Sequence, residues 1–90
     1  MANNLLPLNY AIIKLFTDGK DRSAQDVVNE LKPEYGGYRL LTLKDVDEAL
    51  STAKENGLLD EVSAELNGSN LKITYQLNSY GRDLVDRFIG

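Results

Sequence analysis

The chain has 90 residues, of which 42% are hydrophobic and 27% charged, and its formal net charge is −4. This is the balance of one small globular domain, near the lower size limit for a single hydrophobic core. Cysteine and histidine are both absent, which removes the commonest nucleophiles, general bases and zinc ligands, so we expect neither an enzyme nor a bound cofactor or metal. No run approaches the roughly 18 apolar residues of a membrane span, and residues 1–4 lack the basic flank of a signal peptide, so we expect a cytoplasmic protein without membrane contact.

Two helices are predicted in the first third of the chain. The first covers residues 6–16, with Pro7 tolerated in its first turn, and its apolar stripe consists of Leu8, Ala11, Ile12, Leu15 and Phe16. Ser23 begins the second, because Ser-Ala-Gln-Asp is a capping-box pattern in which the hydroxyl accepts a hydrogen bond from an amide of the first turn. We expect Pro33 to end this helix, whose stripe consists of Ala24, Val27, Val28 and Leu31.

Capping signals also bound a third and a fourth helix. Thr42 starts the third in the same way as Ser23 starts the second, and Asn56-Gly57 is expected to end it with a left-handed cap, after which Leu58 packs back on the last turn. The inward-facing residues of the third helix are Leu43, Val46, Ala49, Leu50 and Ala53. Asn78 caps the fourth helix, whose apolar side consists of Gly81, Leu84, Val85, Phe88 and Ile89.

Between these two helices, alternating segments flank Asn67-Gly68, which is the strongest short-range signal of a β-hairpin. A two-residue loop at this dipeptide pairs Leu66 with Ser69 and Val62 with Ile73, and a four-residue loop over residues 67–70 keeps the same two faces. Lys72 and Thr74 belong to the exposed face. We expect the apolar side chains to share the buried face: Val62, Ala64, Leu66, Leu71, Ile73, Tyr75 and Leu77.

Three helices, a β-hairpin and a fourth helix, in this order, predict an α+β winged helix, with residues 1–90 as one domain. Residues 23–31, the Gly-Leu-Leu at 57–59 and the Tyr-x-Leu-Asn-x-x-Gly-x-x-Leu at 75–84 resemble matching segments of the winged helix-turn-helix domains of bacterial transcription regulators (the MarR/PadR-like superfamily), with Asn78 in place of the habitual Thr. Residues 10–16 and the chain length also resemble the small YjcQ-type proteins. The resemblance implies transcription regulation through DNA.

One feature departs from that family pattern. Residues 32–41 separate the second and third predicted helices, where a DNA-binding helix-turn-helix has a turn of about three or four residues. A link of this length need not hold the third helix at the usual angle, so the groove-reading geometry does not follow from the resemblance.

The excess negative charge lies on the third helix and the hairpin. Residues 40–57 carry two basic and four acidic residues, residues 58–77 carry one and three, and the rest of the chain is balanced. The exposed face of the third helix has two interpretations, a recognition helix in the major groove or a solvated face with internal pairs such as Lys44 with Glu48. We favour the second, because the carboxylates repel phosphates. In the hairpin, which forms the wing, Glu61 and Glu65 can pair with Lys72 across the strands and balance its charge.

Candidate binding residues follow from these patterns. If DNA is bound, the expected contacts are Arg22, Arg39, Lys44 and Ser51. The Tyr-Gly-Gly-Tyr-Arg loop at 35–39 is either a recognition loop, with Tyr35 and Tyr38 as partner contacts, or an insertion whose tyrosines pack over the junction of the second and third helices, which we favour. Apolar residues near the two ends predict a partner surface, most simply a weak homodimer: Leu5, Leu6, Phe88 and Ile89.

We therefore expect a DNA-binding domain of the transcription-regulator type whose affinity for double-stranded DNA is weak or depends on a partner. The alternative belongs to another class, a protein–protein interaction module on a winged-helix scaffold that does not bind DNA.

Overall fold

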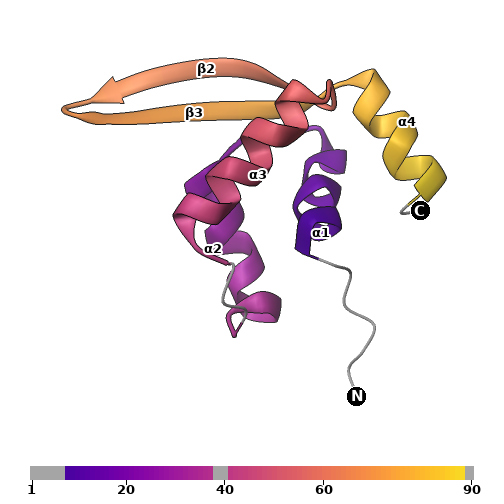
Figure 1. The fold of residues 1–90 in the computed structure, drawn as a ribbon, viewed down its shortest axis with the longest axis horizontal. Helices are drawn as coiled ribbons and strands as arrows, with labels where there is room; N and C mark the ends of the chain where they lie inside the picture. The colour runs from indigo at the N-terminus through magenta and orange to yellow at the C-terminus, as the bar shows by residue number, and fades with distance from the viewer. Residues whose placement is uncertain (1–7, 38–40, 89–90) are drawn as a thin grey trace.

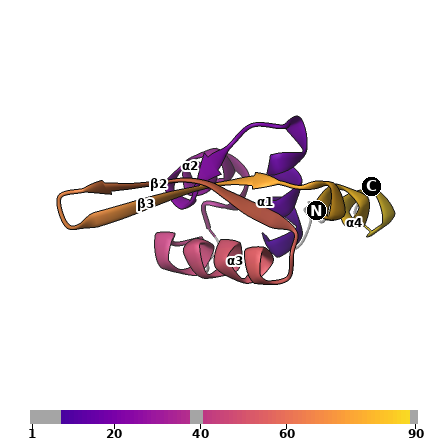
Figure 2. The ribbon, with the colours of Figure 1, turned by 90° about the horizontal axis from the view of Figure 1, so that it is seen from above.

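The helices α1 (Leu8–Leu15), α2 (Ala24–Tyr35) and α3 (Leu43–Glu55) lie together beneath the base of a long β-hairpin, which projects beyond them (Figure 1). The computed structural model describes residues 8–37 and 41–88. The hairpin consists of β2 (Leu59–Asn67) and β3 (Asn70–Leu77), and α4 (Ser79–Phe88) lies at the opposite end of the molecule from the hairpin turn (Figure 2). The predicted order of elements is confirmed, and the fold is an α+β winged helix.

Short polar side chains begin the helices where the sequence predicts. Ser23, Thr42 and Asn78 each accept a hydrogen bond from the backbone N–H three residues on, at 3.3, 3.1 and 2.8 Å, which satisfies an amide that has no partner within the helix. At the end of α3, Gly57 has a φ of 86°, and the N–H of the next residue donates to the carbonyl of Ala53 at 2.9 Å. These caps fix the boundaries of α3 and α4 through residues close in the sequence.

The prediction that Pro33 ends the second helix is wrong. Proline removes one helix hydrogen bond and crowds the carbonyl four residues before it, but its φ suits a helix, and α2 continues for two more residues to Tyr35. The link between α2 and α3 is therefore residues 36–42 rather than 32–41, which brings it closer to the turn of a helix-turn-helix than the sequence indicated.

A short strand that the sequence did not reveal completes the sheet. After α1, the 3-10 turn Phe16–Asp18 leads to β1 (Arg22–Ser23), which pairs antiparallel with β3 and gives the strand order β1-β3-β2. Two residues are too few for an alternating pattern to be visible. This pairing ties the start of α2 to the hairpin.

The hairpin has the register of the four-residue-loop alternative at its tip, but its loop consists of two residues, Gly68 and Ser69, because residues 67 and 70 belong to the strands. Leu66 lies opposite Leu71 and Asn67 opposite Asn70, but a β-bulge between Glu61 and Ser63 shifts the pairing by one residue toward the base. The bulge removes Val62 from the face where it was expected, and its side chain is exposed. The predicted pairs of Leu66 with Ser69 and of Val62 with Ile73 are therefore wrong.

The predicted buried face of the hairpin is buried only at its base. Tyr75 and Leu77 are buried and Ile73 packs partly against the core, whereas Leu66 and Leu71 are 70% and 62% exposed. The outer half of the hairpin extends past the helices and has nothing to pack against (Figure 1). Alternation identifies a face, but not how far the rest of the fold covers it.

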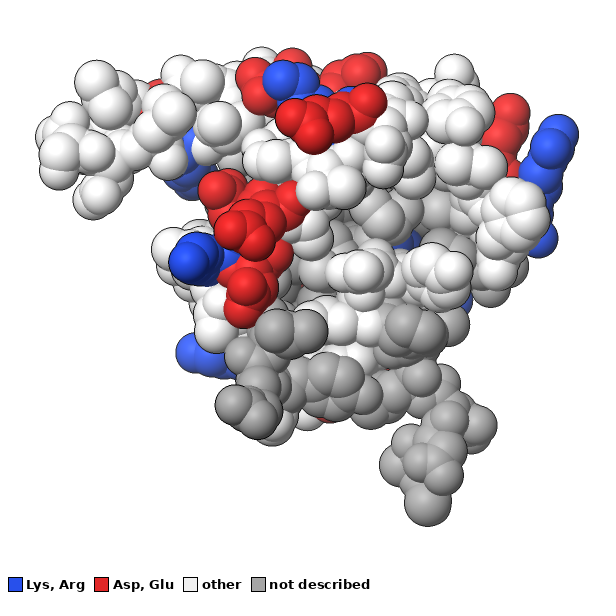
Figure 3. All heavy atoms as spheres, viewed as in Figure 1, with Lys and Arg blue, Asp and Glu red and all other residues white. Residues whose placement is uncertain are grey.

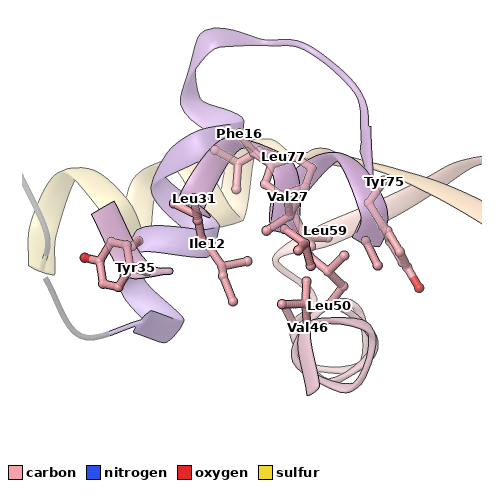
Figure 4. Close-up of a cluster of buried hydrophobic side chains, with 14 residues drawn as sticks. Ile12, Phe16, Val27, Leu31, Tyr35, Val46, Leu50, Leu59, Tyr75 and Leu77 are labelled. Carbon is pink, nitrogen blue, oxygen red and sulfur yellow. The ribbon is translucent and has the colours of Figure 1, made fainter. Parts of the chain in front are cut away.

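The hydrophobic core lies where α1, α2 and α3 meet the base of the sheet. Its largest fully buried side chains come from every one of these elements: Tyr75, Phe16, Ile12, Leu50, Leu59, Val27 and Val46 (Figure 4). The inward stripes predicted for the first three helices supply most of these residues. The core holds α3 against β2 and so sets the angle at which its outer face is presented.

Candidate nucleic-acid interface

The exposed surface of α3 has two edges that face different surroundings. One edge lies beside the hairpin, as the contact of Lys54 with a strand residue shows. Helical spacing places Asp47 and Ser51 on the same edge. Asp45 and Glu48 lie on the other edge, where they line a groove toward α1 and α4. Figure 3 shows acidic side chains gathered over α3, and of the acidic residues of this helix Asp45 and Glu48 also line the groove.

The ion pair between Lys54 and Glu61 joins α3 to β2. Lys54 Nζ lies 3.0 Å from Glu61 Oε2, and this contact raises the pKa of Lys54 above its ordinary value. The β-bulge makes the pair possible, since it turns Glu61 to the face that also carries Tyr75, its partner in the ladder. A strict alternating pattern places Glu61 on the opposite face, so no signal in the sequence indicates this pair.

The candidate DNA contacts on α3 remain accessible. Lys44 is exposed in the first turn and Ser51 is partly exposed at mid-helix. The predicted pair of Lys44 with Glu48 does not form in the described part of the chain, as is common for exposed ions that gain little from pairing in water. Lys44 is therefore a free cation beside the hairpin edge of α3.

Arg22 does not have the geometry of a phosphate contact, which corrects the sequence prediction. It is only 6% exposed, and its guanidinium donates to Asp18, to Glu30 and to the carbonyl of Leu15 at 2.7–2.9 Å. It also stacks over the Phe16 ring, 5.7 Å from the centroid. This cluster joins β1 to α2 and to the turn after α1, so the residue is structural. Arg39 lies outside the described residues.

The wing offers little positive charge to a phosphate backbone. Its one cation, Lys72, lies directly opposite Glu65. The pKa of Asp26 at the start of α2 is lowered mainly by the backbone N–H of Ser23, and the charge of Lys72 lowers it further. Lys72 forms no ion pair within the described residues, but its ladder partner is a carboxylate. Near the turn, the α3-facing side of the hairpin carries the exposed Leu66 and Leu71 instead of a cation.

The residues predicted to bind a protein partner fall into three groups. Tyr35 lies in the last turn of α2 and is only 2% exposed, so its assignment to a recognition loop is wrong and the packing interpretation holds for it. Phe88 is 72% exposed at the end of α4, as a contact residue requires. Tyr38, Leu5, Leu6 and Ile89 lie outside the described residues, and the homodimer stays a prediction.

Over residues 8–37 and 41–88, no helix is long and apolar enough to span a bilayer. The same residues contain no cluster of carboxylates that could hold a metal ion.

The winged-helix fold of the chain is also found in solved structures. Bacillus subtilis PadR, in a crystal structure with operator DNA, matches with a TM-score of 0.73 and 22% identity, over 91% of this chain and 46% of PadR. A PadR-family transcription regulator from Clostridium difficile R20291 matches with a TM-score of 0.65 and 14% identity, over 92% of this chain and 98% of that protein. This chain thus spans about half the length of PadR. No family model and no curated protein sequence matches it.

Proposed function

We propose that this chain is a DNA-binding domain of the transcription-regulator type, with α3 as its recognition helix, and that its own affinity for duplex DNA is weak. The observation that carries the proposal is the match, over 91% of the chain, to a PadR structure that contains operator DNA. Winged helices place the exposed side of such a helix in the major groove and the hairpin beside it.

The hairpin-side edge of α3 supports base and phosphate contacts. Lys44 is exposed and free to reach a guanine or a phosphate, and Ser51 can donate to either. Asp47 on the same edge can accept only from a base donor such as the cytosine amino group. This edge therefore favours discrimination among sequences over tight binding to any duplex.

The affinity for DNA is weak because several basic side chains already lie near carboxylates of the chain. Arg22 and Lys54 form ion pairs with carboxylates of the chain itself, and Lys72 is the ladder partner of Glu65. A cation that is already neutralised releases few counterions from DNA, and counterion release supplies most of nonspecific affinity. A second domain or a partner that adds basic residues would raise the affinity.

Selection from a random-sequence duplex pool at low salt, followed by fluorescence anisotropy, tests the proposal. We expect one sequence class to be enriched, and Lys44→Ala to weaken its binding by about tenfold or less, as expected for loss of a contact worth about 1 kcal/mol. Lys14→Ala is the matched control, because Lys14 is an exposed cation on α1. Absence of any enriched class, or equal loss in both variants, contradicts a recognition role for α3.

The alternative function, a protein-interaction module, is favoured by one observation. The groove between α1, α3 and α4 is apolar and open, and it lies on the side of α3 away from the hairpin.

A further inference from the structure

An apolar groove of about 790 Å³ separates α3 from α1 and α4. This volume is within the range of roughly 300–1,000 Å³ found for binding sites. Its walls include Ile13 from α1, Ala49 from α3 and Leu84 from α4. Figure 3 shows uncharged surface between the acidic side chains over α3 and the charged side chains of α4. Covering such an apolar surface with a partner lowers the free energy.

The charges of the groove all have one sign. Its charged lining residues are Asp45 and Glu48, on the same edge of α3. Asp45 accepts a hydrogen bond from the Thr42 hydroxyl at 2.9 Å, whereas Glu48 makes no hydrogen bond or ion pair within the described residues. An occupant with a basic side chain at this edge would therefore meet an uncompensated carboxylate beside apolar surface.

We propose that the groove binds an amphipathic α-helix of a partner protein, with its apolar side chains in the groove and a Lys or Arg against Glu48. The walls are helices, whose backbone groups are bonded internally, so an extended peptide would find no strand edge to pair with. A helix satisfies its own backbone and presents apolar residues at the spacing of i, i+4 and i+7.

Exposed aromatic residues at the rim fit such an occupant. Phe88 projects from the last turn of α4, and Tyr10 is half exposed on α1. Aromatic side chains at the edge of an apolar groove are frequent anchors of protein interfaces, because they bury a large area with few rotatable bonds.

A second copy of this chain fits the groove less well than a basic helix. The exposed charges of α4 are balanced, with Arg82 and Arg87 against Asp83 and Asp86. A symmetric contact would also bring Glu48 and Asp45 of both copies to one interface, in a protein whose net charge is −4. Like charges at an interface oppose association.

A designed peptide of about 18 residues, long enough to form appreciable helix, tests the proposal on the full chain. One version places Leu at helical spacing with Lys on the flanks, and a second version replaces each Lys by Glu. We expect the Lys peptide to bind at least about tenfold more tightly in anisotropy titrations. Phe88→Ala should weaken it by about tenfold, and Glu48→Gln by about two- to fivefold.

Glu55→Gln is the matched control, because Glu55 is exposed on α3 but does not line the groove. It should leave the affinity for the Lys peptide unchanged. Equal binding of the two peptides, no binding of either, or equal effects of Glu48→Gln and Glu55→Gln would overturn the proposal. So would sedimentation equilibrium that finds a dimer of the chain alone which Phe88→Ala dissociates. None of these outcomes bears on DNA binding by the other edge of α3.

Discussion

Arg22 binds the Asp18 carboxylate through two parallel hydrogen bonds, Nη1 to Oδ1 at 2.9 Å and Nη2 to Oδ2 at 2.7 Å. These bonds, together with the backbone N–H of Lys20, hold the pKa of Asp18 far below its ordinary value. The ionised carboxylate is thus favoured in the folded chain. Its contribution to stability is complete above the pKa of the unfolded carboxyl, about 3.9, and is lost as the pH falls from there toward the folded pKa.

Asp18→Asn should therefore lower the free energy of unfolding most at neutral pH. We expect the difference from the parent chain to be largest at pH 7 and to shrink steadily below about pH 4, where the unfolded carboxyl becomes protonated. Urea denaturation at several pH values measures this difference. Asp21→Asn is the control, since Asp21 is exposed and forms no ion pair within the described residues. A pH-independent difference for Asp18→Asn would contradict the role of its ionised form.

Gly81 allows α4 to approach the end of α3. A Cβ at this position would overlap the carbonyl oxygen of Leu58 and lie 2.6 Å from Leu77 Cδ1. Because the carbonyl belongs to the backbone, Gly81→Ala should cost about 1–3 kcal/mol of unfolding free energy, as overpacking usually does. Gly37→Ala, where nothing lies within 4 Å of the added carbon, should change it by about 0.5 kcal/mol or less. Thermal or chemical denaturation of the two variants gives the comparison.

Two leucines of the same strand should respond very differently to truncation. Leu59 is fully buried at the base of β2, and Leu66 is exposed near the hairpin turn. Leu59→Ala should cost about 2–5 kcal/mol, whereas Leu66→Ala should stay within about 0.5 kcal/mol. A similar loss in both variants, measured by denaturant titration, would mean that the outer hairpin packs against part of the protein.

Carboxylates near the wing should control nonspecific DNA affinity. At physiological salt we expect no binding of random duplex tighter than about 10 μM. The double variant Glu61→Gln and Glu65→Gln leaves Lys54 and Lys72 without their neighbouring carboxylates and should bind about two- to fivefold more tightly at low salt.

Asp83→Asn with Asp86→Asn removes the same number of charges from α4, at the other end of the molecule, and provides the matched control. Anisotropy at two salt concentrations distinguishes a local effect from one of net charge. An equal gain in both double variants would assign the weak affinity to net charge alone.

Local patterns in the sequence predicted the helices and their caps because these depend on neighbouring residues. Ser23 and Thr42 each accept a hydrogen bond from a backbone amide three residues on, so the cap is visible in the local sequence. The bulge at Val62 and the burial of Arg22 could not be predicted, since each depends on contacts between segments distant in the sequence. Tyr35 is an intermediate case: it continues the helical stripe of Val28 and Leu31, but this periodic signal conflicts with the stop signal of the proline two residues before it.

The turn of the hairpin is a practical site for labels and insertions. Residues 65–72 are all exposed, including Gly68 and Ser69 at the tip. Surface turns of this kind tolerate added residues because no packed backbone is disturbed. A fluorophore or short tag placed there would report on any molecule that approaches the hairpin side of α3, and would leave the folding of the helices unchanged.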